Sequence, residues 1–204
     1  GGKIDTDIDF GTPTSMITAI GNMVPKTWTP LAETLREMVG YFRQDDPYYT
    51  SNSPADYKVG TAYDPYYYRY SLVSGSTLTN QYVPCAKSFI LMLTDGESTM
   101  DKNMPAWLKD YDNDSNDPDP DARYPSKGSD YLDDVALWAR TVDHRSALNG
   151  NQNVLLYSVF LFGKGSRLLM DASINGGFDD LDGDGKPGCL KSTPSQQDLR
   201  ECYR

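Results

Sequence analysis

The feature that most restricts the fold is a short, uninterrupted apolar run, Phe89–Leu93, which ends abruptly at Thr94 and Asp95. A strand without polar alternation is typical of a parallel α/β sheet that is buried on both faces. Polar residues at the carboxyl end of such a strand lie where α/β folds bind ligands. A second apolar run covers Val154–Phe162. The two runs are predicted to be adjacent, central, parallel strands.

Helical periodicity surrounds these strands. Apolar spacing predicts a helix from about Pro30 to Phe42, with Thr29 as its N-cap. A second helical pattern runs from Leu132 to Val142, and a short third one begins near Leu168. Strands that alternate with helices predict an α/β fold with a parallel sheet. Two strands cannot close such a core, so further strands are expected outside this sequence.

Three long segments lack sustained periodicity. Residues 44–84 form a Tyr-rich insertion, 98–131 an Asp-rich insertion, and 179–204 an acidic loop with an irregular tail. We interpret the tyrosines of the first insertion as packing onto the domain. Long insertions in compact domains are also often functional, so a segment ordered by a partner is the alternative.

Charge and composition exclude several classes of protein. The net charge of -10 disfavours binding to nucleic acid phosphates. No apolar run reaches the roughly 18 residues that a membrane span requires. The chain opens at Gly1 without a Met or a visible signal peptide, so we interpret it as a piece of a longer polypeptide.

The cysteines are Cys85, Cys189 and Cys202, and none forms a C-x-x-C pair, which argues against zinc-ribbon and thioredoxin sites. Cys189 and Cys202 are close enough to close a short loop, which would stabilise the fold by about 3 kcal/mol. The sequence leaves open whether this bridge forms. If it does, Cys85 pairs outside the chain or stays reduced.

Enzymatic motifs are missing. His144 is the only histidine, which argues against a Ser-His-Asp triad and most zinc sites. There is neither a G-x-S-x-G motif nor a P-loop. His144 lies near a predicted helix end and is expected at the surface or beside the carboxyl end of the helix dipole. We expect that the chain is not an enzyme.

Two acidic loops have the spacing of calcium ligands, because alternate side chains of a tight loop can turn onto one hard cation. The first loop offers Asp110, Asp112, Asp114 and Asn116, but Ser115 replaces the usual glycine. Neither loop has the glutamate that completes an EF-hand, so other ligands must come from backbone, water or elsewhere. The second loop offers Asp180, Asp182 and Asp184, with Gly185 intact at the turn.

Several stretches resemble one known family. Thr27–Glu33 and Phe89–Glu97 resemble two characteristic stretches of von Willebrand factor A domains. Their T-P-L-A-E and L-T-D-G-E forms are similar to those of the PilY/PilC family of type IV pilus tip adhesins. Met104–Leu108, Tyr131–Ala136 and Gly176–Phe178 also resemble that family, and the likeness covers most of residues 20–188.

The resemblance implies part of one von Willebrand factor A-like domain, with a Rossmann-like parallel sheet and helices on both faces. Its metal-ion-dependent adhesion site uses a D-x-S-x-S motif, a Thr and an Asp. Thr29 and Asp95 match the Thr and the Asp. The D-x-S-x-S motif is missing, so the site is incomplete in this chain, with calcium or magnesium as its expected ion.

The function implied by the resemblance is an extracellular, calcium-binding adhesion module at a pilus tip or cell surface. Expected partners are the remainder of the parent polypeptide, pilins or minor pilins, and a host or surface ligand. The alternative is a calcium-rigidified structural subunit of an extracellular filament, in which the Tyr-rich insertion forms an assembly interface.

Overall fold

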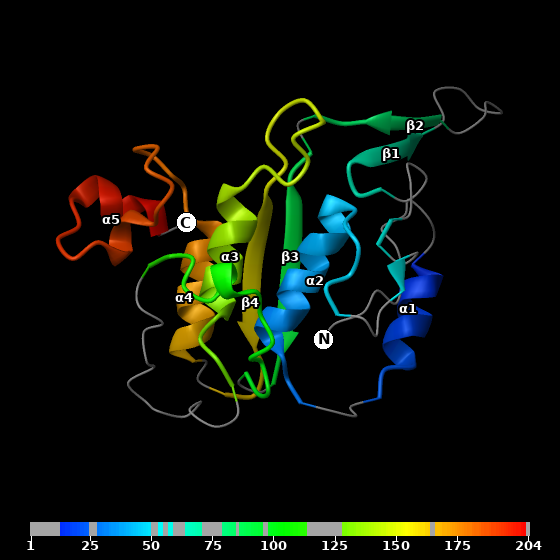
Figure 1. The fold of residues 1–204 in the computed structure, drawn as a ribbon, viewed down its shortest axis with the longest axis horizontal. Helices are drawn as coiled ribbons and strands as arrows, with labels where there is room; N and C mark the ends of the chain where they lie inside the picture. Colours follow the sequence, from blue (N-terminus) through cyan, green and yellow to red (C-terminus); the bar gives the residue numbers. More distant parts are fainter. Residues whose placement is uncertain are drawn as a thin grey trace.

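The computed structural model describes residues 13–24, 28–49, 53–54, 57–58, 64–70, 79–84, 86–95, 98–113, 128–163 and 166–202. These residues form a mixed α/β structure, as the sequence predicts. Its elements (Figure 1) are α1 Thr14–Gly21, α2 Leu31–Arg43, β1 Tyr67–Tyr70, β2 Thr79–Tyr82, β3 Ser88–Thr94, η2 Ala106–Leu108, α3 Leu132–Thr141, β4 Val154–Phe160, α4 Arg167–Gly177, η3 Gly188–Leu190 and α5 Gln196–Cys202.

The two predicted apolar strands pair with each other in parallel. Ser88 of β3 lies opposite Val154 of β4, and Thr94 lies opposite Phe160. Helix α3 lies between them in the chain and makes the crossover. Both strands therefore end at the same edge of the sheet. The prediction that these strands are adjacent and parallel is confirmed. The prediction that they are central is wrong for the described residues, because this sheet has two strands and each of them is an edge strand.

Helices α2, α3 and α4 pack on one face of this sheet and enclose the core (Figure 1). Helix α4 crosses β4 so closely that a Cβ atom on Gly176 would lie 2.6 Å from the Cβ of Leu156. Only glycine allows this approach without a shift of the backbone. The buried side chains of the core include Leu35, Val39, Val135, Ala136, Leu156, Leu169 and Ala172.

The other face of the sheet is apolar and exposed. Phe89, Leu91 and Leu93 on β3 are 52%, 62% and 60% exposed, and Tyr157 and Val159 on β4 are also exposed. Side chains of a strand alternate between the faces, so these residues share the outer face. For the described residues, the prediction that these strands are buried on both faces is therefore wrong. Of the two helical layers that the resemblance implies for a whole domain, the described residues form one. Exposed apolar faces of this kind mark interaction surfaces.

Part of the Tyr-rich insertion is regular, which its sequence did not reveal. Strands β1 and β2 pair in an antiparallel ladder, with Tyr67 opposite Tyr82. Tyr49, Tyr57 and Tyr66 of the same insertion are buried. This burial supports the interpretation that its tyrosines pack onto the domain.

The prediction of an irregular tail is also wrong, since η3 and α5 lie within residues 179–204. Each is too short for its sequence to show a clear helical period. Contacts across the tail, described below, hold the two elements together.

The third cysteine, Cys85, lies outside the described residues.

His144 is buried and does not lie at the surface. Its ring packs edge-on against Trp138, with the ring centroids 4.8 Å apart, and its Nε2 lies 3.0 Å from the carbonyl oxygen of Ala139. The position beside the last turn of α3 agrees with the prediction. Burial lowers the pKa of His144 to about 4, so the ring carries no charge at neutral pH.

No helix among the described residues combines the length and the apolar character that a membrane crossing requires.

Because one face of the sheet is covered and the other is exposed, a leucine-to-alanine substitution should change the free energy of unfolding differently on the two faces. Leu156→Ala, on the covered face, should lower the free energy of unfolding by about 2–5 kcal/mol, because it leaves a cavity in the core. Leu91→Ala, on the exposed face, should change it by less than about 0.5 kcal/mol. Urea denaturation followed by circular dichroism measures both. Equal costs would mean that the outer face is covered in solution.

Candidate metal-binding sites

The carboxyl end of β3 positions the two predicted adhesion-site residues. Asp95 directly follows the strand and is exposed. The backbone N–H of Thr29 donates to Thr99 Oγ1 at 2.7 Å, and the N–H of Thr99 donates to the carbonyl oxygen of Thr29 at 2.9 Å. These bonds tie Thr29 to the segment that follows Asp95. No described contact joins the side chains of Thr29 and Asp95 directly.

Asp101 caps helix α2, so the prediction that Thr29 is its N-cap is wrong. The carboxylate of Asp101 accepts hydrogen bonds from the backbone N–H groups of Ala32 at 2.7 Å and Glu33 at 2.8 Å, and from Ser98 Oγ at 2.7 Å. The first helical N–H groups have no partner within the helix, and a carboxylate from elsewhere satisfies them here. Burial raises the pKa of Asp101 to about 6, although these hydrogen bonds oppose the shift.

The first acidic loop is described only as far as Asn113, so Asp114 and Asn116 lie outside the described residues. Asp110 is exposed. Asp112 turns toward helix α4, where its Oδ2 accepts a hydrogen bond from Asn175 Nδ2 at 3.2 Å. Asp112 therefore contacts the amide of Asn175, a residue that the spacing of the acidic loop did not predict.

Asp134 attaches this loop to helix α3. It is buried, and its Oδ1 accepts hydrogen bonds from the backbone N–H groups of Tyr111 at 2.5 Å and Asp112 at 3.3 Å. Asp134 lies in the first turn of α3, where the helix dipole favours a carboxylate. Asp134 also holds the first acidic loop in place, through hydrogen bonds to residues more than twenty positions earlier in the chain.

The second acidic loop brings its three carboxylates together. Oxygen atoms of Asp180, Asp182 and Asp184 lie within 4.8 Å of one another. Asp180 accepts hydrogen bonds from the backbone N–H groups of Gly183 at 2.7 Å and Gly185 at 3.0 Å. Both glycines have a positive φ, 77° and 74°, which other residues rarely adopt. The D-x-D-G-D-G pattern therefore shapes a turn that points oxygen ligands at one place.

The ammonium group of Lys191 lies among these carboxylates. Its Nζ is 2.8 Å from Asp182, 3.0 Å from Asp184 and 2.8 Å from Asp198. These hydrogen bonds raise the pKa of Lys191, and those from Lys191 and Ser195 lower the pKa of Asp198 to about 2. The lysine thus offsets the carboxylate charge that a bound cation would otherwise offset. A calcium ion coordinated by Asp182 and Asp184 must displace it.

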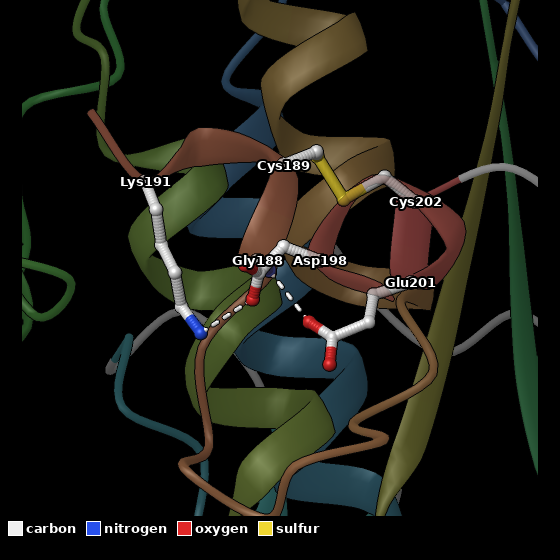
Figure 2. The surroundings of a disulfide bond; sticks show 6 residues. All are labelled: Gly188, Cys189, Lys191, Asp198, Glu201 and Cys202. Atoms are coloured by element: carbon white, nitrogen blue, oxygen red, sulfur yellow. Dashed lines mark hydrogen bonds and ion pairs between the residues drawn. A yellow bond between two sulfur atoms is a disulfide. The ribbon is translucent and has the colours of Figure 1, made fainter. Parts of the chain in front are cut away.

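A disulfide and a buried glutamate fold the tail back onto this loop (Figure 2). The bridge between Cys189 and Cys202, which the sequence left open, is formed, with Cα atoms 6.0 Å apart. Glu201 has no exposed surface and accepts hydrogen bonds from the backbone N–H groups of Gly188 at 2.7 Å and Leu181 at 3.0 Å. A Cβ atom on Gly188 would lie 2.7 Å from the backbone Cα of Asp198, so only glycine fits there without a shift of the backbone.

Sequence reasoning missed Asp101, Lys191, Asp198 and Glu201. One local signal was present: Lys191 stands where a complete calcium loop has its bidentate glutamate, and a lysine there can neutralise the loop itself. The other three act over distances in sequence or from a tail without a clear period, so no local pattern identified them.

Comparison of the chain with protein-family models, curated proteins and solved structures finds no match. Functional inference therefore rests on the motifs and on the geometry of the sites.

The cap of α2 predicts a clear difference between two substitutions. Asp101→Ala should lower the free energy of unfolding by about 2 kcal/mol, because it removes two hydrogen bonds from the start of the helix. Thr29→Val should change it by less than about 0.5 kcal/mol, because the hydroxyl does not cap the helix. Chemical denaturation compares the variants. A larger cost for Thr29→Val would restore the N-cap assignment made from the sequence.

The position of Lys191 predicts competition with calcium. Lys191→Met keeps the length of the side chain and removes its charge, so it should raise the affinity for calcium roughly tenfold or more, since a divalent ion no longer displaces an ammonium group. Titration calorimetry on chelator-treated protein measures the affinity. Lys186→Met is the control, because Lys186 lies in the same loop and contributes no described ion pair to this cluster. Unchanged affinity in Lys191→Met would exclude a calcium site at Asp182 and Asp184.

Proposed function

We propose that the chain is part of an extracellular, calcium-binding adhesion module of a type IV pilus tip or biogenesis protein, built on a von Willebrand factor A-like domain. The observation that carries this proposal is the convergence of Asp180, Asp182 and Asp184 in a glycine-shaped loop. Calcium prefers carboxylate and carbonyl oxygens in flexible loops. The parallel β3–β4 pair and the T-D-G-E stretch, which begins at the last residue of β3, support the architecture.

Calcium would be held in the second loop by Asp180, Asp182 and Asp184, with backbone and water oxygens as further ligands. A bound ion supplies positive charge that offsets the repulsion between these carboxylates. The protein contributes the turn at Gly183 and Gly185, and the disulfide and Glu201 brace the adjacent tail. The loop would then be rigid on an exposed part of the module.

Adhesion is proposed at the carboxyl end of the β3–β4 sheet, beside Thr29 and Asp95. A calcium or magnesium ion held there by a hydroxyl and a single carboxylate would remain electrophilic. Such an ion can accept an acidic group from a host or surface ligand. The D-x-S-x-S residues that complete this site are expected in the remainder of the parent polypeptide.

The exposed apolar face of the sheet supports the expectation that the chain packs against a partner. Phe89, Leu91, Leu93, Tyr157 and Val159 form an apolar surface that would favour burial. We assign its cover to the remainder of the parent polypeptide, which would add the further strands and helices of the domain. Pilins or minor pilins would then bind the assembled protein.

The second candidate function is a calcium-rigidified subunit of an extracellular filament. The same exposed apolar face favours it, because such a face can join neighbouring subunits. Repeated copies of this unit along one fibre would support this reading, whereas a complete D-x-S-x-S motif in the parent polypeptide would support adhesion.

The adhesion proposal predicts the effect of one substitution in the full-length parent protein. Asp95→Ala should abolish surface attachment, because it removes the carboxylate from the proposed ion site, while secretion and folding persist. Asp46→Ala is a matched control, since Asp46 is an exposed aspartate that pairs with Lys58. Attachment assays with circular dichroism of the secreted protein make the comparison. Normal attachment of Asp95→Ala would favour the filament subunit.

A further inference from the structure

A cleft of about 430 Å³ opens beside helices α3 and α4, where both acidic loops approach them. Helix α3 contributes Asp133 and Leu137, which are four residues apart and share one helical face. Helix α4 contributes Arg167, Asp171 and Asn175 at the same spacing. Asp112 and the segment that contains Pro187 and Leu190 form the remaining walls. Clefts of this volume are large enough for small ligands.

Asn175 is the buried polar group of this cleft and is only 1% exposed. Its Nδ2 donates to the carboxylate of Asp112, which fixes the orientation of the amide because a carboxylate at neutral pH only accepts hydrogen bonds. The carbonyl oxygen, Oδ1, then has no hydrogen-bond partner in the protein. A buried carbonyl without a partner is unfavourable, so Asn175 offers an acceptor to a molecule that enters the cleft.

The charges around Asn175 indicate what that molecule carries. Two of the three basic side chains of the wall are already neutralised: Arg167 pairs with Asp171 at 3.1 Å, and Lys191 pairs with the second acidic loop. The third, Lys186, is exposed. Asp112, Asp133 and Asn175 Oδ1 are the acceptors of this wall, and a carboxylate that already has one partner can accept further hydrogen bonds.

A bare metal ion fits this region poorly. Among the described residues, carboxylates converge closely enough for an ion only in the 180–184 loop and at Asp182, Asp198 and Glu201. The cleft also has an apolar wall, formed by Leu137, Pro187 and Leu190. Widely spaced acceptors beside apolar side chains suit an organic cation better than calcium.

We propose that this cleft binds a primary ammonium group carried on an aliphatic stem. Asn175 Oδ1 and Asp112 accept hydrogen bonds from the ammonium group, Asp133 adds negative charge, and Leu137, Pro187 and Leu190 contact the stem. A lysine side chain of another protein and a free diamine share this chemistry. The proposal does not depend on calcium at the 180–184 loop or on adhesion at Asp95. Calcium bound by Asp112 in the first acidic loop would compete with the ammonium group for the same carboxylate.

Nuclear magnetic resonance titration of the whole chain, with chelator present, tests the proposal with three probes. Nα-acetyl-lysine methylamide presents the lysine side chain, 1,5-diaminopentane is the free diamine, and Nα-acetyl-norleucine methylamide lacks the ammonium group. At least one amine should shift the side-chain amide signals of Asn175 saturably, and the norleucine compound should not. Binding of the lysine compound alone identifies a protein source, and binding of the diamine alone identifies free amines.

Variants locate the site. Asp112→Asn removes the charge and keeps the shape, so it should weaken amine binding at least about tenfold. Leu190→Lys, at a half-exposed position, should block the cleft with its own ammonium group and abolish binding without unfolding the chain. Asp46→Asn removes a remote surface carboxylate and should bind like the original protein. Equal shifts with the norleucine compound, no shifts with either amine, or unchanged binding in both cleft variants would overturn the proposal.

Discussion

The buried carboxylate of Asp101 organises the carboxyl edge of the sheet. It lies beyond the end of β3 and holds the first turn of α2, although about seventy residues separate the partners in sequence. Burial disfavours its charge and raises its pKa, and the two backbone N–H groups, Ser98 and the positive end of the helix offset part of this effect. Because of this bond, the chain that leaves β3 lies beside Thr29. The geometry of the proposed adhesion site therefore depends on a residue that does not belong to its motif.

The sequence predicted features that depend on residues close together in the chain, and it missed contacts between residues far apart in the chain. The apolar run at Phe89–Leu93 and the helical period after Pro30 are local patterns, and the structure confirms both elements. The cap by Asp101 and the pairing of Tyr67 with Tyr82 join distant segments, and no local period reports them. The apolar run also led to a wrong conclusion. A continuous run shows that both sides of a strand are apolar, but it does not show that this chain covers both.

The second acidic loop shows the same limit at a candidate site. Its D-x-D-G-D-G pattern predicted the turn, because Gly183 and Gly185 adopt the positive φ that the turn requires. It did not predict that Lys191 would lie among the carboxylates together with Asp198, because both residues belong to a tail whose fold involves the disulfide and Glu201. Converging carboxylates require a positive charge, and either an ammonium group or a metal ion can supply it. The affinity of this loop for calcium therefore depends on how much more favourable the loop is with a bound calcium ion than with the ammonium group of Lys191 in place.

The arrangement of the layers keeps the proposed surfaces separate. The exposed apolar residues lie on the outer face of the β3–β4 sheet, whereas α3 and α4 pack on its inner face. The cleft at Asn175 and the second acidic loop belong to that helical side. Further chain that covered Phe89, Leu91 and Leu93 would bury the apolar face without having to cross the cleft or the loop. The part of the molecule that favours burial is thus distinct from the parts that offer polar groups to ligands, and both can act in one assembled protein.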